Sequence, residues 1–399
     1  MTSPARTVAA RRWMASLGAL RRHLAAILLG LCLAPTMTPA LAEDGSANEC
    51  ESGKAVKLRG GTFRLVNDLF TGTDQNYTNG VAITLVSRDI SGRLDSKCLP
   101  PPLRLQADFI KAVNPGFWAD ADNPANTQNV VVRFGQSIYT PEDHTRKDLI
   151  VDDRPYAGLL YMGLAWNRRI QPQGGTYEML DTREMTVGII GPWSLAERSQ
   201  NLVHDLRHID RFLGWDNQLH NEAAFQVALE RKFKRYVGTG AVSPGWGGDM
   251  IGSYAVRVGN IETAASVGVE LRAGWNLPND FGSYPIRPGT ENRPPTAASG
   301  LRTAQPQSSR APRPGVHAFV NFEAKGVARD FSLDGNLFRS SHHVDRHPWV
   351  AQVAAGISSQ WLMQNHGARL ALMRVWRTRE FDGQSRDHEF GSLSLSIEF

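Results

Sequence analysis

Long hydrophobic runs are scarce in this chain of 399 residues, and cysteine occurs only three times. Beyond residue 42 there is no run of about 18 apolar residues, which excludes helical membrane spans from that part of the chain. The sequence also lacks a G-x-S-x-G motif, so the nucleophilic serine of an α/β-hydrolase is not indicated.

The first 42 residues have the pattern of a removable export signal. A basic segment precedes an apolar stretch from Leu24 to Leu33, and Ala40-Leu41-Ala42 fits an A-x-A cleavage site. A transmembrane anchor is disfavoured, because the apolar stretch is far shorter than the roughly 20 residues that a spanning helix needs. We therefore predict a signal peptide at 1–42 and a single mature domain at 43–399.

The apparent basic charge of the chain belongs to this signal, which holds five arginines and no acidic residue. Removing them reduces the 44 basic residues to 39, which equals the number of acidic residues. A mature chain without net charge gives no support to nucleic-acid binding.

The three cysteines divide between the signal and the mature chain. Cys32 is removed with the signal, although Leu29-Gly30-Leu31-Cys32 also makes a weak lipobox. Cys50 and Cys98 remain as an even pair, and an oxidising compartment favours a disulfide between them over two free thiols.

Short runs of alternating apolar and polar residues recur along the mature chain. In the last of these runs Leu393, Leu395 and Ile397 alternate with serines before the terminal Phe399. Such alternation suits strands with lipid outside and a polar lumen inside. A soluble sandwich alternates similarly, but the export signal and the terminal Phe favour the membrane.

We predict strands at 61–70, 78–89, 129–138, 158–169, 181–191, 222–236, 248–258, 261–275, 315–328, 347–361, 366–378 and 387–399. Twelve is an even number, as single-chain bacterial barrels have. The expected fold is all-β: a twelve-stranded antiparallel transmembrane β-barrel with a short helix in an extracellular loop.

The strand count also assigns the loops to sides. With both termini periplasmic, the connections 71–77, 139–157 and 192–221 are extracellular, and 276–314 is periplasmic. Long loops are usually extracellular in such barrels. Either 276–314 is an exception, or one strand is miscounted.

One segment departs from the strand pattern. Ser194-Leu195-Ala196-Glu197 is a capping-box sequence, and the following residues to Phe212 predict a helix that ends before Gly214. Gln200, His204 and His208 recur every four residues, so a regular helix would place them on one face.

Three polar clusters are expected at the extracellular rim, and each has a structural alternative. The first cluster is also a typical turn-forming sequence. The second is a charged loop, which a solvated rim would also show. The third contains His204, which with His208 and His220 could be a metal set, but its spacing matches no closed zinc pattern. The clusters are 67–80, 139–158 and 200–222.

Together these residues suit ester hydrolysis by activated water. The oxygen atoms of Asn67 and Asp68 suit a hard cation, and calcium is the natural choice outside the cell. A histidine on a helix can act as general base, while a cation stabilises the oxyanion.

Four ordered motifs resemble the outer-membrane lipid A 3′-O-deacylase family. They are Asn67-Asp68-x-Phe70 with Thr73-Asp74-x-x-Tyr77-Thr78-Asn79-Gly80, then 153–158, then Gly191-Pro192 with Gln200-x-x-x-His204, and finally Gly214-Trp215-x-x-Gln218-Leu219. The later half is covered more loosely, through its strands and Leu277-Pro278-x-Asp280-Phe281-Gly282.

The resemblance implies a calcium-dependent hydrolase that removes an acyl chain from lipid A. It makes His204 the base, assigns Asn67 and Asp68 to the active site and the calcium environment, and adds Thr78 to the catalytic set. Basic residues that contact lipid A phosphate map to Arg146 and Lys147, and we assign substrate binding to these two and to Gln200.

The resulting hypothesis is an outer-membrane lipid A deacylase whose active site faces the outer leaflet and whose partners are lipopolysaccharide and the bilayer. We expect a monomer. Two alternatives remain open, namely a channel or structural barrel whose rim clusters only order loops, and an outer-membrane phospholipase. Twelve strands make a modest bore that inward side chains readily fill, which disfavours a channel.

Overall fold

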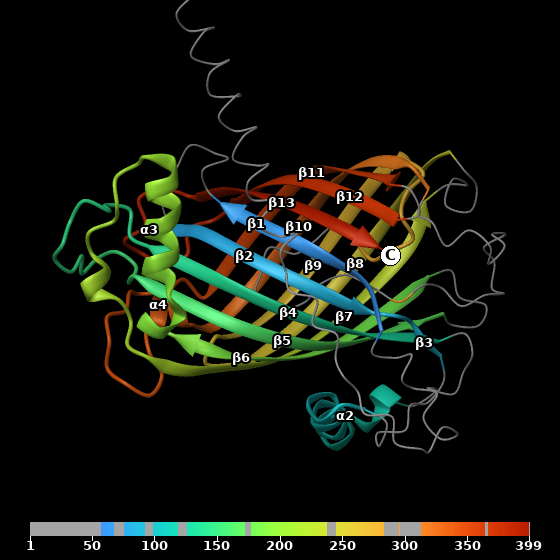
Figure 1. Ribbon diagram of the computed structural model, residues 1–399, viewed down its shortest axis with the longest axis horizontal. Helices are drawn as coiled ribbons and strands as arrows, with labels where there is room; N and C mark the ends of the chain where they lie inside the picture. Colours follow the sequence, from blue (N-terminus) through green and yellow to red (C-terminus); the bar gives the residue numbers. More distant parts are fainter. Residues whose placement is uncertain are drawn as a thin grey trace, which may run out of the picture. The chain divides into compact units, whose positions relative to one another are not determined.

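The computed structural model describes residues 57–67, 76–91, 99–118, 126–171, 177–237, 245–282, 295, 313–363 and 366–398 (Figure 1). Residues 67, 76–79 and 91 are described by their backbone alone. The predicted signal peptide, the Cys50–Cys98 pair and Asp68 lie outside the described residues.

Within these ranges, twelve long antiparallel strands close into a barrel, as predicted (Figure 1). β1 pairs with both β2 and β13, which closes the sheet. The two-residue β3 pairs with β4 beyond the end of β2. The strands are β1 Leu58–Asn67, β2 Asn76–Ser87, β3 Ile90–Ser91, β4 Thr127–Thr140, β5 Ala157–Ile170, β6 Glu178–Ile190, β7 Glu222–Val237, β8 Trp246–Gly259, β9 Glu262–Trp275, β10 Gly315–Asp330, β11 Trp349–Met363, β12 His366–Arg377 and β13 His388–Glu398.

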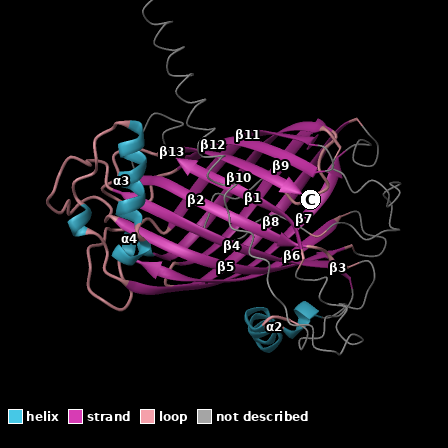
Figure 2. Ribbon diagram, in the orientation of Figure 1, coloured by secondary structure: helices cyan, strands magenta, loops and turns pink. Residues whose placement is uncertain are grey.

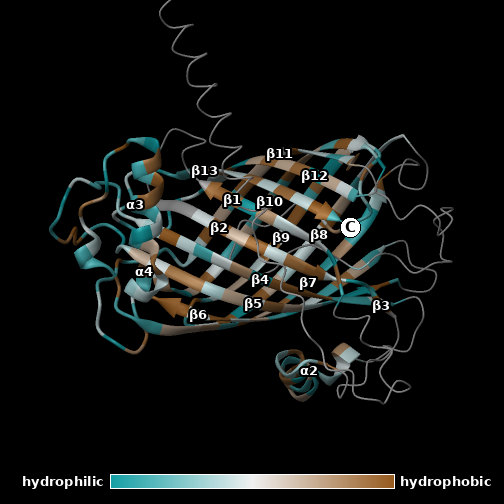
Figure 3. Ribbon diagram, viewed as in Figure 1, coloured by the Kyte–Doolittle hydropathy of each residue, from teal (hydrophilic) through white to brown (hydrophobic). Residues whose placement is uncertain are grey.

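Alternation along the strands separates an apolar exterior from a polar interior, and Figure 3 shows the two kinds of residue alternating. On β9, Val267 and Leu271 are exposed, whereas Glu270 and Arg272 between and beside them are buried. Successive side chains of a strand point to opposite faces, so the exposed aliphatic residues form the outer surface. The predicted arrangement of lumen and exterior is confirmed.

The lumen is filled by paired charges. Arg272 and Asp249 form a fully buried ion pair with a separation of 2.6 Å, and Arg133 approaches Glu184 at 3.1 Å. Charges removed from water need such partners. The bore of the barrel is therefore occupied by side chains.

A loop segment inserts into the lumen at the end of the barrel that carries residues 57 and 398. The Asn279 side chain accepts hydrogen bonds from Lys234 and Arg169, each at 2.6 Å. Asp280 forms ion pairs with Arg272 and Arg369. These two guanidinium groups overcome the effect of burial and hold the pKa of the Asp280 carboxyl well below its ordinary range. The segment follows β9, so the loop 276–314 begins at the end to which the strand count assigned it.

The other end of the barrel carries most of the helical elements and is called the helical rim below (Figure 2). It contains the 3₁₀ turns η5 Pro192–Ser194 and η6 Trp215–Asn217, the helix α3 Ala196–Arg207 and the short α4 Phe331–Asp334. Two apolar clusters are buried in the barrel. They are Val66, Phe319, Ala354, Ala371, Met373, Val375 and Phe390, and Ala157, Leu159, Tyr161, Ile190, Leu219, Ala224, Ile261 and Phe331.

A helix that was not predicted from the sequence lies on the outer face of the barrel. α2 Pro101–Val113 begins with prolines in its first turn, where no N–H bond is needed, and the 3₁₀ turn η4 Pro115–Trp118 follows. Leu103, Ala107 and Ile110 pack with Trp166 of β5. Their helical spacing was a usable signal inside a connection treated as a loop. Among the described residues, no helix is both long enough and apolar enough to cross a membrane.

The predicted capping box is wrong. Ser194 belongs to η5, and Leu195 precedes α3 in the left-handed conformation with φ 60° and no side-chain cap. Leu195 thus reverses the chain between two short helices, and the serine cannot reach the N-terminus of α3. The helix also ends earlier than predicted, at Arg207, because His208 adopts φ 57°.

Candidate active site at the helical rim

α3 holds two of the predicted site residues against the barrel. Gln200 and His204 are 2% and 3% exposed and lie one turn apart on the face that also buries Ala196. His208 is exposed, because its left-handed conformation takes it off the helical face. The predicted common face therefore includes Gln200 and His204 but not His208.

The imidazole of His204 is oriented by the chain that follows the helix. Its Nδ1 lies 2.6 Å from the carbonyl oxygen of Asp210, and its ring meets Phe212 edge to face at 5.0 Å. A carbonyl can only accept, so this bond places the proton on Nδ1. Nε2 is then the nitrogen that can accept a proton, which is the requirement for a general base.

The side-chain amide of Gln200 is buried without a hydrogen-bond partner among the described residues, at both Oε1 and Nε2. Buried amides in native proteins are almost always satisfied. The buried amide of Gln200, one turn from His204, is therefore suited to binding a polar ligand.

The second predicted cluster packs directly on the third. Leu213 N–H donates to His144 O at 3.0 Å, and the His144 ring stacks on Phe212 at 4.5 Å. Asn217 donates to the carbonyl of Lys147 at 2.7 Å. The loop 141–156 is thereby held next to the segment that orients His204, and Arg146 within it is exposed and paired with Asp148.

The first predicted cluster meets the other two through Ile138. This buried residue packs with Ala196 and Phe212 beneath α3 and pairs with Asn79 on β2. The register shifts between Tyr77 and Asn79, which makes Thr78 the extra residue of a bulge. Bulges are frequent beside active sites because they redirect a side chain.

Asn67 completes this part of the rim through its backbone, which pairs with Asn79 and with Gly391. Its side chain and that of Thr78 lie outside the described atoms, as does all of Asp68. The position of Asn67 at the helical rim follows from its place at the end of β1 (Figure 1).

Arg154, in the second predicted cluster, is buried and does not belong to a solvated rim. It is 1% exposed, and its Nη2 lies 3.1 Å from Glu380 in the loop between β12 and β13. Its guanidinium also lies 5.4 Å from the Phe381 ring centroid. Because these partners are more than 200 residues apart, no local sequence pattern could have found them.

The alternative zinc set receives no support. His208 and His220 are both exposed, and the described residues hold no group of three or more His, Cys, Asp or Glu side chains placed to bind a metal ion. Asp68 and the side chain of Asn67, to which the calcium prediction assigns the ion, lie outside the described atoms.

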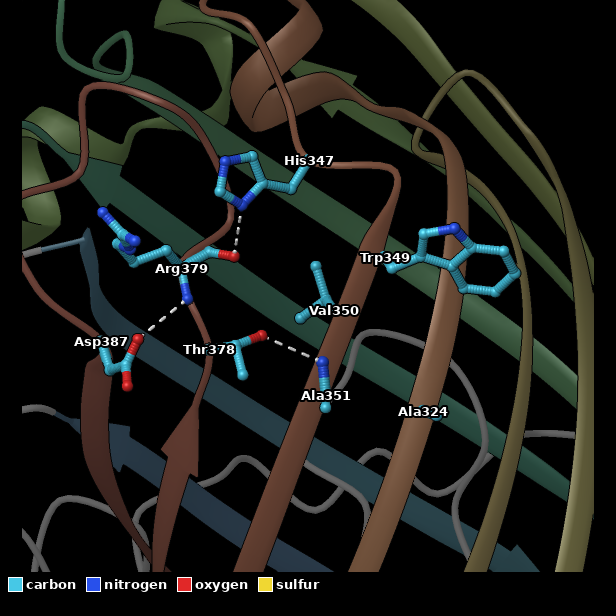
Figure 4. A pocket seen from close by; sticks show the side chains of 8 residues that line it. All are labelled: Ala324, His347, Trp349, Val350, Ala351, Thr378, Arg379 and Asp387. Atoms are coloured by element: carbon cyan, nitrogen blue, oxygen red, sulfur yellow. Dashed lines mark hydrogen bonds between the residues drawn. The ribbon is translucent and has the colours of Figure 1, made fainter.

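An open hollow of about 450 Å³ lies elsewhere at the helical rim, on strands β10–β12 (Figure 4). His347 is fully engaged there, because Nδ1 contacts Arg379 O at 3.2 Å and Nε2 contacts Asp382 at 2.8 Å. No predicted site residue lines it. Its lining is Ala324, His347, Trp349, Val350, Ala351, Thr378, Arg379 and Asp387.

Residues 28–399 match one family model, described as outer membrane protein LpxR. The chain belongs to the LpxR family. This membership confirms the predicted family and supports an outer-membrane location and a role in lipid A modification. No curated protein sequence matches the chain.

A solved structure shares this fold. LpxR from Salmonella typhimurium superimposes with a TM-score of 0.57 at 16% identity, covering 85% of this chain and 100% of that one. The β domain of the Bordetella autotransporter BrkA covers 86% of this chain and 100% of its own, with a TM-score of 0.40 and 10% identity. At these identities the likeness to LpxR shows the shared barrel fold.

Proposed function

We propose that this protein hydrolyses an ester-linked acyl chain of lipid A, with His204 as the general base. The observation that carries the proposal is the hydrogen bond from His204 Nδ1 to Asp210 O, which orients a buried imidazole at the rim of a barrel of the LpxR family. Nε2 takes a proton from water as the water oxygen attacks the ester carbonyl. The proton then passes to the departing sugar hydroxyl, leaving a free fatty acid.

Gln200 is assigned to bind a polar group of the substrate near the reacting ester. Its amide is buried and lacks a partner among the described residues, and it lies one turn before His204 on the same face of α3. An N–H aimed at a developing oxyanion stabilises the transition state more than the ground state.

Calcium remains part of the proposal, with Asn67 and Asp68 as the residues that would hold it. A bound calcium ion would polarise the ester carbonyl and stabilise negative charge on its oxygen. The backbone position of Asn67 at the helical rim supports this assignment. Arg146 and Lys147 in the adjoining loop supply positive charge suited to the phosphate groups of lipid A.

The outer surface of α3 supports a substrate that resides in a membrane. Leu202 and Leu206 are 60% and 57% exposed, on the side of the helix opposite Gln200 and His204. Exposed leucines at this spacing suit contact with acyl chains. The filled lumen, including the inserted Asp280, counts against the channel alternative.

The test is the mass of lipid A from cells that produce each variant. Wild type is expected to remove an acyl chain, and His204→Ala is expected to remove none. His208→Asn is the matched control, because it changes the next histidine on the same segment and asparagine tolerates φ 57°. Full deacylation by His204→Ala would refute the role of this residue.

Two further experiments distinguish the remaining alternatives. Glycerophospholipid hydrolysis by purified protein without lipid A hydrolysis would identify a phospholipase. A chelator is expected to abolish deacylation and added calcium to restore it. Deacylation that is unchanged in chelator would remove calcium from the mechanism.

A further inference from the structure

A group of four charged side chains lies on the outer side of β5, β6 and β7, toward the end of the barrel opposite the helical rim, and two of them, Arg168 and Asp181, are buried. Apart from the exposed Arg235 near the end of β7, the other outward positions on these strands are apolar, and Met162, Val187 and Leu229 are exposed. The two-residue period of a strand puts Arg168, Asp181, Arg183 and Arg231 on this same outer side. Charged residues on the lipid face of a barrel are costly near the bilayer centre and tolerated near its interfaces.

These charges are grouped around a single carboxylate. Asp181 lies opposite Arg168 on β5 and opposite Arg231 on β7. It accepts two hydrogen bonds from Arg231, at 2.5 and 2.7 Å, and Arg183 follows two residues along β6. Three guanidinium groups against one carboxylate leave an excess of two positive charges.

Arg183 and Arg231 are held in position by their surroundings. The Arg183 guanidinium lies 4.9 Å from the Phe117 ring centroid, and its Nη1 donates to Thr182 O at 3.0 Å. Its Nε is buried without a partner among the described residues. Arg231 is bound by Asp181 at Nε and Nη2. An arginine has five N–H donors, so donors remain at both side chains for an anion.

Aromatic residues beside the cluster indicate its depth. Phe233 lies 6.0 Å from Tyr177 and 6.1 Å from Tyr254 between ring centroids. Both tyrosines are exposed, at 41% and 46%, and Tyr254 pairs with Arg231. Exposed tyrosines on a membrane protein concentrate at the level of the lipid headgroups. The arginines therefore lie at headgroup depth.

We propose that Arg183 and Arg231 bind the phosphate of an anionic glycerophospholipid in the leaflet at this end of the barrel. Guanidinium groups match phosphate oxygens in geometry and charge, and one anionic headgroup offsets part of the excess positive charge. Exposed Leu229 and neighbouring apolar positions contact its acyl chains. The site is separate from the helical rim and does not depend on the proposed deacylase activity.

Native mass spectrometry of the full chain in detergent, after incubation with phosphatidylglycerol, tests this site. Wild type is expected to retain phosphatidylglycerol in preference to diacylglycerol with the same chains. Arg183→Gln, which leaves the Asp181–Arg231 pair intact, is expected to weaken retention about fivefold. Arg374→Gln is the matched control, because Arg374 is an exposed arginine of β12 paired with Glu389, and it is expected to retain lipid as wild type does.

Asp181→Asn changes the charge of the cluster in the opposite direction. It tests the site if the Arg183→Gln variant does not fold. It adds one positive charge to the cluster and is expected to tighten retention about fivefold. Equal retention by wild type and both cluster variants would overturn the site. Equal retention of diacylglycerol, equal loss in Arg374→Gln, or displacement of the lipid by inorganic phosphate would overturn it as well.

Discussion

At the scale of single residues, Gln200 and His204 meet different surroundings although they lie one turn apart. The imidazole of His204 is bonded to Asp210 O and packed against Phe212. The amide of Gln200 is equally buried, yet lacks a partner among the described residues. An unsatisfied buried amide lowers stability, so this residue opposes folding while serving the proposed site.

Replacing Gln200 by Leu separates these two effects. The free energy of unfolding is expected to stay the same or rise by about 1 kcal/mol, because an unpaired buried polar group is removed. Deacylation is expected to fall about 100-fold, the usual cost of losing an oxyanion donor. Unfolding in lipid vesicles and lipid A mass spectra measure the two quantities. A destabilised variant with full activity would show that Gln200 is structural.

At the scale of the element, α3 presents different residues to its two sides. Its inner side buries Ala196, Gln200 and His204, and its outer side exposes Leu202 and Leu206. A helix that only ordered a loop would expose polar residues on that outer side. The exposed leucines fit a helix whose outer side contacts the acyl-chain region beside the rim.

The double variant Leu202→Ser, Leu206→Ser tests this contact. Activity on lipid A in membranes is expected to fall about tenfold, since less apolar surface is removed from water. Activity on detergent-dispersed lipid A is expected to remain, because neither leucine faces His204. Leu105→Ser, an exposed leucine of α2, is the control. An equal loss in both assays would place the leucines in the site itself.

At the scale of the whole molecule, Glu380 joins distant parts of the barrel at the helical rim. Its carboxylate lies 3.1 Å from Arg154, in the loop before β5, and 3.1 Å from Arg377 at the end of β12. Burial raises its pKa, but Arg377, His388 and Arg154 outweigh burial and hold the pKa well below its ordinary range. A carboxyl with a lowered pKa stabilises the folded state above its unfolded pKa.

The stability supplied by Glu380 is therefore present at neutral pH and is lost as the pH falls below about 4.5 toward its lower folded pKa. Glu380→Gln is expected to destabilise the barrel by about 3–5 kcal/mol at pH 7, because two buried guanidinium groups lose the negative charge opposite them. The pH dependence of urea unfolding is expected to be flatter in the variant. Glu389→Gln, which breaks the more exposed pair with Arg374, should cost about 1 kcal/mol or less. Equal losses in both variants would refute the special role of Glu380.

Much of the fold could be predicted because the alternation of residues along a strand reflects the environment of each of its two faces. Alternation such as that of Val267, Glu270 and Leu271 requires one face in lipid and one in the lumen, whatever the other strands do. Counting strands then placed Asn67, Arg146 and His204 at one end of the barrel. The left-handed Leu195 was missed because a loop conformation depends on the surface against which it packs, whereas α2 was missed although its apolar residues recur at helical spacing.

The sequence by itself determined the strands, the inner and outer faces, and the end of the barrel at which the proposed chemistry lies. Each of these follows from a period of two residues and from strand direction, which are local properties. Only the tertiary structure decided that Asp210 and Phe212 orient His204 and that Glu380 pairs with Arg154. It also placed a surplus of arginine around Asp181. Such contacts form when closure of the barrel brings remote strands together. The sequence around one residue of such a contact does not identify the other.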